Sequence, residues 1–283
     1  MTKSLLFRAW KQELIVDPGN LPQRELLRMI ELQNISYAYG TQDILQDVNL
    51  ELPEHGFTVL AGPNGAGKST LLYLLMAYLK PKTGSIRLRG RELHKYSRSE
   101  LARIIAFIPQ ELHSEFDYTV LETVLMGRFP YLGIMQNYGE EDKELALGAL
   151  EQMNLLDLKD RFVSELSGGE KQRVYLVRAL VQNTRFIFLD ESLSQLDINY
   201  QLEIMRLLKS ISQTQDKAIL LISHNLNLAA NYADRMLFIK NGKLLYAGSP
   251  NQAMQSSHLD ELFGIKLTVA RNPISGVNNI VYP

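Results

Sequence analysis

The chain has 283 residues, a formal net charge of −1 and 46% hydrophobic residues, which is the composition of an ordinary globular protein. It has no global basic field to attract nucleic acid, and the absence of cysteine excludes disulfides and thiolate-ligated metal sites. The longest apolar run, residues 71–79, is far shorter than the roughly 20 residues that cross a bilayer. We therefore expect a cytoplasmic protein that reaches a membrane only through a partner.

The first segment, residues 1–28, precedes any regular pattern. Leu6, Trp10 and Leu14 have helical spacing, but the pattern is short, and we interpret the segment as a loosely packed extension. From residue 29 onward the stretches IELQNISYAY and ILQDVNLELP alternate apolar and polar residues, as half-buried strands do.

The central part of the chain predicts an α/β sheet with a helical insertion. FTVLAG, SIRLRG and RIIAFIPQ are expected strands, and residues 111–165 are mainly helical in pattern. Apolar strands and helices then alternate, with strands at RFIFLDE, KAILLIS, RMLFIK and KLLYAG and helices from Gly168, Asp197 and Asn225. Because this alternation is typical of a parallel sheet covered on both faces, we predict an α/β fold.

A phosphate-binding turn joins FTVLAG to the helix that begins at Lys68. Its two glycines are separated by four residues and are followed by lysine and serine, which is the P-loop pattern. Backbone N–H groups of such a loop cradle phosphates, Lys68 would reach the β- and γ-phosphate oxygens, and Ser69 would ligate Mg²⁺. The predicted nucleotide-binding residues are Gly62, Pro63, Asn64, Gly65, Ala66, Gly67, Lys68, Ser69 and Thr70.

Two carboxylates end the apolar strand FIFLDE. Asp190 falls at the carboxyl end of the strand, where doubly wound sheets bind ligands, and it suits the binding of Mg²⁺ through water. Glu191 follows directly and could polarise a water molecule for in-line attack on the γ-phosphate. Solvated acids that merely end a strand are the alternative, and the nearby P-loop favours the catalytic interpretation.

The sequence LSGGEKQR forms a second turn that could bind phosphate. A single nucleotide site would not need both this turn and the P-loop. Ser167 can cap the following helix with the glutamate three residues on, which presents the Gly168 and Gly169 amides and the positive end of the helix. With this turn in place, residues 29–254 resemble the ATPases of the ATP-binding-cassette (ABC) family. The resemblance implies that two such domains pack head to tail, so that Ser167, Gly168 and Gly169 bind the γ-phosphate on the partner's P-loop.

The resemblance also implies a fold and a domain division. We expect an α/β P-loop NTPase core of the ABC type, which is RecA-like, with an antiparallel β subdomain and an inserted helical subdomain at about residues 111–165. The ATPase domain would span residues 29–254 and a C-terminal tail residues 255–283.

Further site residues follow from the same resemblance. Tyr39 in YAYG resembles the aromatic residue that stacks on adenine, with Tyr37 on the same strand face as the alternative. Gln110 resembles the Q-loop glutamine, which contacts Mg²⁺ or the attacking water. SQLD at residues 194–197 resembles the D-loop that crosses to the partner, and His224 the switch histidine that contacts the γ-phosphate. The resemblance therefore makes Lys68, Gln110, Glu191 and His224 catalytic, and Ser69, Gln110 and Asp190 metal-binding.

The chain departs from the family pattern at a few positions. Ser192 and Leu193 follow Glu191 where the family usually has Pro-Thr, Gln195 replaces the usual alanine, and Asn225 follows the histidine where aspartate is common. None of these changes removes a phosphate, metal or base residue. We expect them to alter the dimer interface and the rate of hydrolysis rather than the chemistry.

Three classes of ABC protein are compatible with these motifs: the ATPase subunit of an importer, a non-transport ATPase acting on ribosomes or DNA, and an ATP-dependent clamp that hardly hydrolyses. A single set of motifs, an insertion without heptads or cysteine, and Glu191 favour the first. The segment DYTVLETVLMGRFPYLG and the segment after His224 resemble the ATPases of iron-siderophore, haem and vitamin B12 importers. Zinc or manganese import is the nearest alternative.

The expected partners follow from this class. We expect a peripheral protein on the cytoplasmic face of the membrane that works as a homodimer with ATP and Mg²⁺. It would act under membrane permease subunits, indirectly with a substrate-binding protein, and without nucleic acid. Exposed Arg128 and Phe129 in the insertion are expected to anchor the permease. In the alternative, Phe129 packs inside the subdomain and Arg128 is merely solvated.

Overall fold

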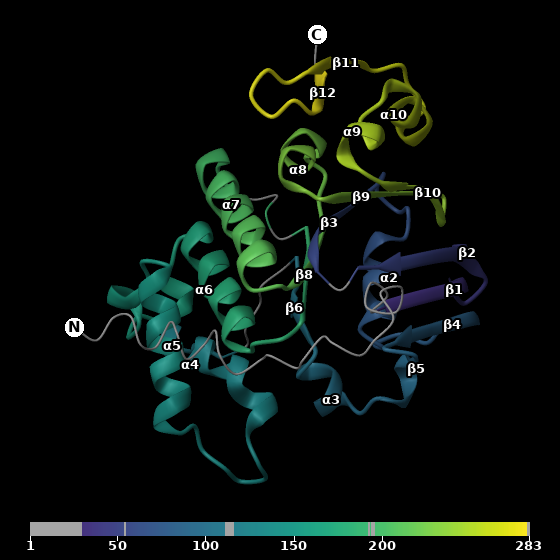
Figure 1. Ribbon diagram of the computed structural model, residues 1–283. Helices are drawn as coiled ribbons and strands as arrows, with labels where there is room; N and C mark the ends of the chain where they lie inside the picture. Colours follow the sequence, from purple (N-terminus) through teal and green to yellow (C-terminus); the bar gives the residue numbers. More distant parts are fainter. Residues whose placement is uncertain (1–29, 54, 111–115, 192, 194–195, 282–283) are drawn as a thin grey trace, which may run out of the picture.

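The computed structural model describes residues 30–53, 55–110, 116–191, 193 and 196–281, and Figure 1 shows their arrangement. The expected extension over residues 1–28 lies outside this part of the chain, as do Ser192 and Gln195, two of the departures from the ABC pattern. The described chain forms a four-stranded sheet, a six-stranded sheet, a two-stranded hairpin and the helices around them.

The four-stranded sheet is antiparallel and has the strand order β2-β1-β4-β5. Its strands are β1 (Ile30–Tyr39), β2 (Gln42–Leu52), β4 (Thr83–Leu88) and β5 (Arg91–Glu92). Alternating residues bury one face, and the buried pair Leu32 and Leu50 lies directly opposite across β1 and β2. The predicted antiparallel subdomain is therefore confirmed.

The six-stranded sheet has the order β10-β9-β3-β8-β7-β6. Its strands are β3 (Gly56–Ala61), β6 (Ile105–Ile108), β7 (Phe186–Asp190), β8 (Ala218–Ile222), β9 (Arg235–Lys240) and β10 (Lys243–Gly248). All neighbours are parallel except β9 and β10, which form an antiparallel hairpin at one edge. The apolar strands of the sequence thus become a buried, mostly parallel sheet, as predicted.

The two faces of this sheet contribute to two separate hydrophobic cores, as β7 illustrates. Ile187 and Leu189 point into a core shared with α4 to α8, whereas Phe186 and Phe188 point into a core shared with α2 and the antiparallel sheet. Figure 1 shows the same layering, with α6 and α7 on one side of the parallel strands and α2 with β1, β2 and β4 on the other.

Four helices begin at their predicted starts or one residue later: α2 at Lys68, α6 at Gly168, α7 at Ile198 and α8 at Leu226. The α-helices of the described residues are α2 (Lys68–Leu75), α3 (Arg98–Ala102), α4 (Val120–Leu125), α5 (Glu140–Gln152), α6 (Gly168–Val181), α7 (Ile198–Thr214), α8 (Leu226–Tyr232), α9 (Pro250–Ala253) and α10 (Ser256–Phe263). The 3₁₀ helices are η1 (Leu93–Lys95), η2 (Met126–Tyr131), η3 (Leu156–Leu158) and η4 (Val163–Glu165). The helical character expected for residues 111–165 agrees with α4, η2, α5, η3 and η4. Within the described ranges, no helix combines the length and apolarity needed to cross a bilayer.

The segment expected as a C-terminal tail is folded where it is described. It contains α10 and a hairpin of β11 (Thr268–Arg271) and β12 (Asn278–Val281). The Asn227 side chain on α8 donates to Ile280 O at 2.9 Å and accepts from Ile280 N at 2.7 Å. Ile280 is buried in the core that also contains α8, so the hairpin packs on the body of the protein.

Candidate nucleotide site

The turn between β3 and α2 is pressed closely against strand β9. A Cβ atom on Gly62 would lie 2.1 Å from Ile239 O, so only glycine fits there. Gly67 has a φ of 100° and caps α2, a left-handed conformation that favours glycine. Lys68 is buried, and its ammonium donates to Gly62 O at 3.1 Å and Pro63 O at 3.0 Å. The lysine side chain therefore folds back across its own loop, and its ammonium lies against the first residues of the turn.

Burial also changes the pKa of Lys68. Desolvation lowers its pKa from the ordinary value, while the carboxylates of Glu191 and Asp190 act in the opposite direction. The two carbonyls that hold the ammonium carry no net charge. Phosphate oxygens at this turn would supply the negative charge that a buried ammonium favours.

A hydroxyl and a carboxylate meet at the end of β7. Ser69 Oγ on α2 donates to Asp190 Oδ1 at 3.2 Å. Burial raises the pKa of Asp190, whereas the hydrogen bond from Ser69 and the charge of Lys68 lower it. These are oxygen ligands of the kind that Mg²⁺ prefers. The described residues contain no cluster of three or more His, Asp or Glu side chains that could bind a metal alone.

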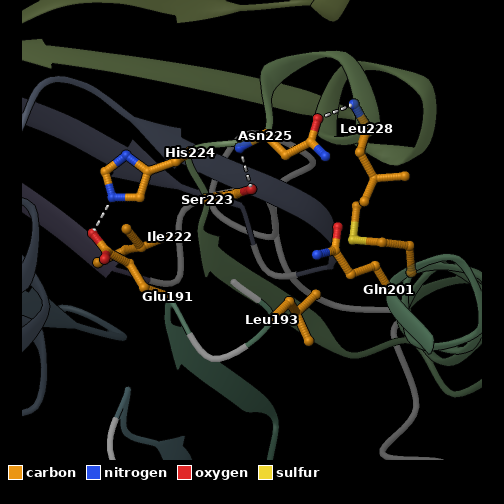
Figure 2. A pocket seen from close by; sticks show the side chains of 9 residues that line it. Glu191, Leu193, Gln201, Ile222, Ser223, His224, Asn225 and Leu228 are labelled. Carbon is orange, nitrogen blue, oxygen red and sulfur yellow. Dashed lines mark hydrogen bonds and ion pairs between the residues drawn. The ribbon is translucent and has the colours of Figure 1, made fainter. Parts of the chain in front are cut away.

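Glu191 brings three distant parts of the chain together. Its Oε1 lies 2.6 Å from His224 Nε2 and 3.7 Å from Lys68 Nζ, and its Oε2 accepts from Gln110 Nε2 at 3.2 Å. Figure 2 shows the His224 ring pointing at this carboxylate from the end of β8. Of the predicted catalytic residues, Lys68, Gln110 and His224 therefore all lie against the fourth, Glu191.

The backbone at Glu191 is strained. Its φ is 43°, in the left-handed region, which costs a non-glycine residue on the order of 1 kcal/mol. Strain of this kind is tolerated where the surrounding contacts fix the side chain, and here the contacts to His224, Lys68 and Gln110 do so.

A cavity of about 320 Å³ adjoins the pair formed by Glu191 and His224. Figure 2 shows its lining, which comes from the ends of β7 and β8 and from α7 and α8. The cavity therefore opens beside the Glu191 and His224 side chains, on the side of α7 and α8. Its lining residues are Glu191, Leu193, Gln201, Met205, Ile222, Ser223, His224, Asn225 and Leu228.

The two tyrosines at the end of β1 differ in exposure. Tyr39 is 48% exposed, whereas Tyr37 is half-buried and packs against the core. Their rings meet edge to face with centroids 5.0 Å apart. Of the two alternatives for an adenine-stacking residue, Tyr39 is the one that presents an open ring.

The hydrogen bonds of the second glycine turn come from its own helix. Ser167 caps α6 through the predicted capping box: its Oγ accepts from Glu170 N at 3.3 Å, and the Glu170 carboxylate accepts from Ser167 N at 2.9 Å. A Cβ on Gly168 would meet nothing within 4 Å. The hydrogen bonds of Ser167 stay within the first turn of α6, and Ser167 and Gly168 are exposed.

The expectation that Arg128 is exposed is wrong. Its side chain is only 14% exposed, and its guanidinium donates to Asp142 Oδ1 at 2.8 Å and to Val181 O at 3.2 Å. It also lies over the Tyr131 ring, 4.1 Å from the centroid. Arg128 thus ties η2 to α5 and α6 inside the helical insertion. Phe129 is 70% exposed, as expected, so the alternative in which it packs inside is wrong as well.

Two exposed apolar residues near Phe129 did not stand out in the sequence. Ile134 and Met135 are 98% and 100% exposed in the loop between η2 and α5. The sequence pattern that could have indicated them is a pair of large apolar residues in a segment between two predicted helices.

Comparison with known proteins agrees with this geometry. Residues 45–194 match the model of a family described as ABC transporter. The petrobactin import ATP-binding protein YclP of Bacillus subtilis is 34% identical over 89% of this chain and 97% of its own length. The iron(3+)-hydroxamate import ATP-binding protein FhuC of the same organism is 32% identical over 87% and 92%.

A solved structure gives the same result for the fold. A protein described as a metal-chelate type ABC transporter in an inward-facing conformation superposes with a TM-score of 0.78 at 28% identity, over 90% of this chain and 97% of that one. The chain is therefore an ATP-binding protein of the ABC transporter family.

Proposed function

We propose that this chain is the ATP-hydrolysing subunit of an ABC importer and that Glu191 activates the attacking water. One observation carries the proposal: the Glu191 carboxylate contacts Gln110 and His224 and lies 3.7 Å from the P-loop ammonium of Lys68. A carboxylate fixed beside the phosphate-binding cation is placed to accept a proton from water that attacks the γ-phosphate.

The remaining residues of the site have complementary roles. The backbone N–H groups of residues 62–70, other than that of Pro63, which has none, bind the phosphates together with Lys68, and the Tyr39 ring stacks on adenine. Ser69, Asp190 and Gln110 would hold Mg²⁺, which when bound neutralises charge on the phosphates. His224 orients the Glu191 carboxylate in the absence of nucleotide and contacts the γ-phosphate when it is present.

The second glycine turn supports a homodimer with composite sites. Gly168 has no positive φ, and its missing Cβ would meet nothing in its own chain, so this chain's fold does not require glycine there. The turn also opens a 14-residue helix, whose N-terminus favours negative charge. Both features fit a turn that closes on a phosphate held by a second copy. Ser167, Gly168 and Gly169 would act in trans.

Exposed apolar residues support a membrane partner docked on the helical insertion. Phe116, Phe129, Ile134, Met135 and Phe162 are all more than one-third exposed on this subdomain. Side chains of this kind are typical anchors of protein interfaces. We assign this surface to permease subunits, which would hold the protein on the cytoplasmic face of the membrane. The ATPase domain would span residues 29–254, with the helical insertion at about 111–165.

The substrate class rests on the relatives. YclP and FhuC are named for petrobactin and iron(3+)-hydroxamate import, and the chain aligns with nearly their full length. We therefore assign an iron-siderophore, haem or cobalamin-type substrate, delivered by a substrate-binding protein. Zinc or manganese import is the second candidate.

Uptake measurements test this function. Cells that lack this chain should lose uptake of radiolabelled iron supplied as hydroxamate or catecholate chelates, or of haem or cobalamin. They should keep uptake of zinc and manganese. Wild-type chain should restore uptake, and Glu191→Gln should not. A loss confined to zinc or manganese would replace the substrate class, and retention of all uptake would overturn the importer assignment.

A further inference from the structure

The first turns of α6 and α7 lie against each other through one aromatic ring. A Cβ on Gly169 would lie 3.3 Å from Cδ2 and 3.4 Å from Cε2 of Tyr200. One turn further along α6, the Arg173 guanidinium lies 5.4 Å from the centroid of the same ring. Because Gly169 and Arg173 are four residues apart, they share a helix face, and Tyr200 covers that face.

The residue after Tyr200 holds a different segment. Gln201 Nε2 donates to Leu196 O at 2.8 Å. Leu196 belongs to the sequence SQLD, which precedes α7 directly. Two consecutive residues of α7 therefore contact the glycine turn on one side and the end of SQLD on the other.

The two glycines of the turn are consequently required for different reasons. The space where a Gly168 side chain would stand is open, whereas a Cβ on Gly169 would be in tight contact with the Tyr200 ring of the same chain. A larger residue at 169 would push the turn and α7 apart. A larger residue at position 168 would contact no atom of its own chain and could clash only with a partner that binds there.

We propose that Tyr200 is a positioning residue, which sets the glycine turn at a fixed distance from the start of α7 so that the donors of the turn reach the partner's nucleotide. The proposal rests on the composite site described above. Donors around a phosphate must lie within about 3 Å of its oxygens, so a small displacement of the turn removes their contribution. Tyr200 makes no contact with nucleotide in this role and acts only through Gly169.

The test uses ATP-driven dimerisation in a Glu191→Gln background, measured by light scattering after gel filtration. Tyr200→Ala should raise the ATP concentration needed for half-dimerisation by between about 10- and 100-fold. Tyr200→Phe keeps the ring and should restore dimerisation. Gln213→Ala, exposed near the far end of α7, is the matched control and should have no effect. Binding of a fluorescent ADP to the monomeric P-loop should be the same in all variants, which separates positioning from loss of fold.

A double-mutant cycle gives the decisive measurement. In the Tyr200→Ala chain, Gly169→Ala should cost much less dimerisation than in the wild-type chain, because the ring it would strike is gone. Gly168→Ala should cost the same in both. Dimerisation unchanged by Tyr200→Ala, or a Gly169 effect independent of Tyr200, would overturn the proposal. Failure of the Glu191→Gln chain itself to dimerise with ATP would instead overturn the composite site.

Discussion

His224 Nε2 lies 2.6 Å from Glu191 Oε1, the oxygen that also faces the Lys68 ammonium at 3.7 Å. One carboxylate oxygen thus contacts the histidine at the end of β8 and faces the lysine of the P-loop. A γ-phosphate bound at the P-loop would compete with Glu191 for Lys68. The arrangement therefore allows nucleotide binding to release the carboxylate from its cationic neighbour and leave it available to water.

If Glu191 is the base, replacing it should slow ATP hydrolysis without weakening ATP binding. Glu191→Gln keeps the size of the side chain but removes the base, so the rate of phosphate release should fall by about 10²- to 10⁴-fold. ATP should still bind, and the dimer should persist because its ATP is not consumed. Hydrolysis close to the wild-type rate would exclude Glu191 as the base.

The exposure of Tyr39 predicts a specific loss of nucleotide affinity. Tyr39→Ala should weaken ADP binding by about 10-fold, since stacking of a base on an aromatic ring contributes about 1–3 kcal/mol. Tyr37→Ala is the matched comparison. It should lower the melting temperature through lost packing and change ADP affinity less. Equal effects of both substitutions on affinity would contradict the assignment of Tyr39.

The contacts of Arg128 predict a stability defect instead of an interface defect. Arg128→Met leaves the Asp142 carboxylate without its cationic partner, and breaking such a pair costs on the order of 3 kcal/mol. Urea denaturation of the isolated protein should detect this loss. Phe129→Ala should leave stability nearly unchanged and impair co-purification with the permease. A stable Arg128→Met chain would show that the contacts to Asp142 and Val181 contribute little.

Lys217 predicts a dependence of stability on alkaline pH. This buried lysine donates to Thr184 O and Asn183 Oδ1, and burial, aided by the charge of Arg185, lowers its pKa to about 8. The unfolded chain keeps this proton up to its ordinary pKa of 10.5. Between these values the unfolded state binds more protons, so this group increases the free energy of unfolding as pH rises.

The comparison with Lys217→Met isolates that effect. The wild-type minus mutant difference in the free energy of unfolding should be constant below pH 8 and should rise between pH 8 and 10.5. Denaturant titrations at pH values below and within this window measure it. A difference that stays constant across the window would mean that the ammonium remains charged in the fold.

A mixed dimer distinguishes composite sites from self-contained ones. One protomer carries Lys68→Ala, which removes the phosphate-reaching cation, and the other carries Ser167→Arg, which blocks the capping turn. In composite sites, one site receives both lesions and the other remains intact, so the heterodimer should still protect ATP. Each homodimer should protect none and serves as a control. A heterodimer that protects no ATP would mean that both turns serve the same chain.

The strands, the P-loop and the two acids that end β7 are predictable because each is encoded in a short run of residues. Asp190 and Glu191 end an apolar strand, and the P-loop needs only a short run of residues to be recognised. Arg128 was mispredicted because its partners, Asp142 and Val181 O, lie on helices that the sequence does not place beside it. The hairpin at Ile280 was expected only as a tail, since its hydrogen bonds to Asn227 span 53 residues.

The central strand β3 has its neighbours far along the chain. It pairs with β8 from Gly56 opposite Ala218 and with β9 from Thr58 opposite Arg235. A ribosome makes the chain at 5–20 residues per second, so the roughly 160 residues between β3 and β8 take about 10–30 s to appear. Phe57, Val59 and Leu60 meanwhile have no sheet to enter, although β1, β2 and β4 can already pair. Synthesis is then the stage at which the apolar side chains of β3 stay exposed and open to aggregation.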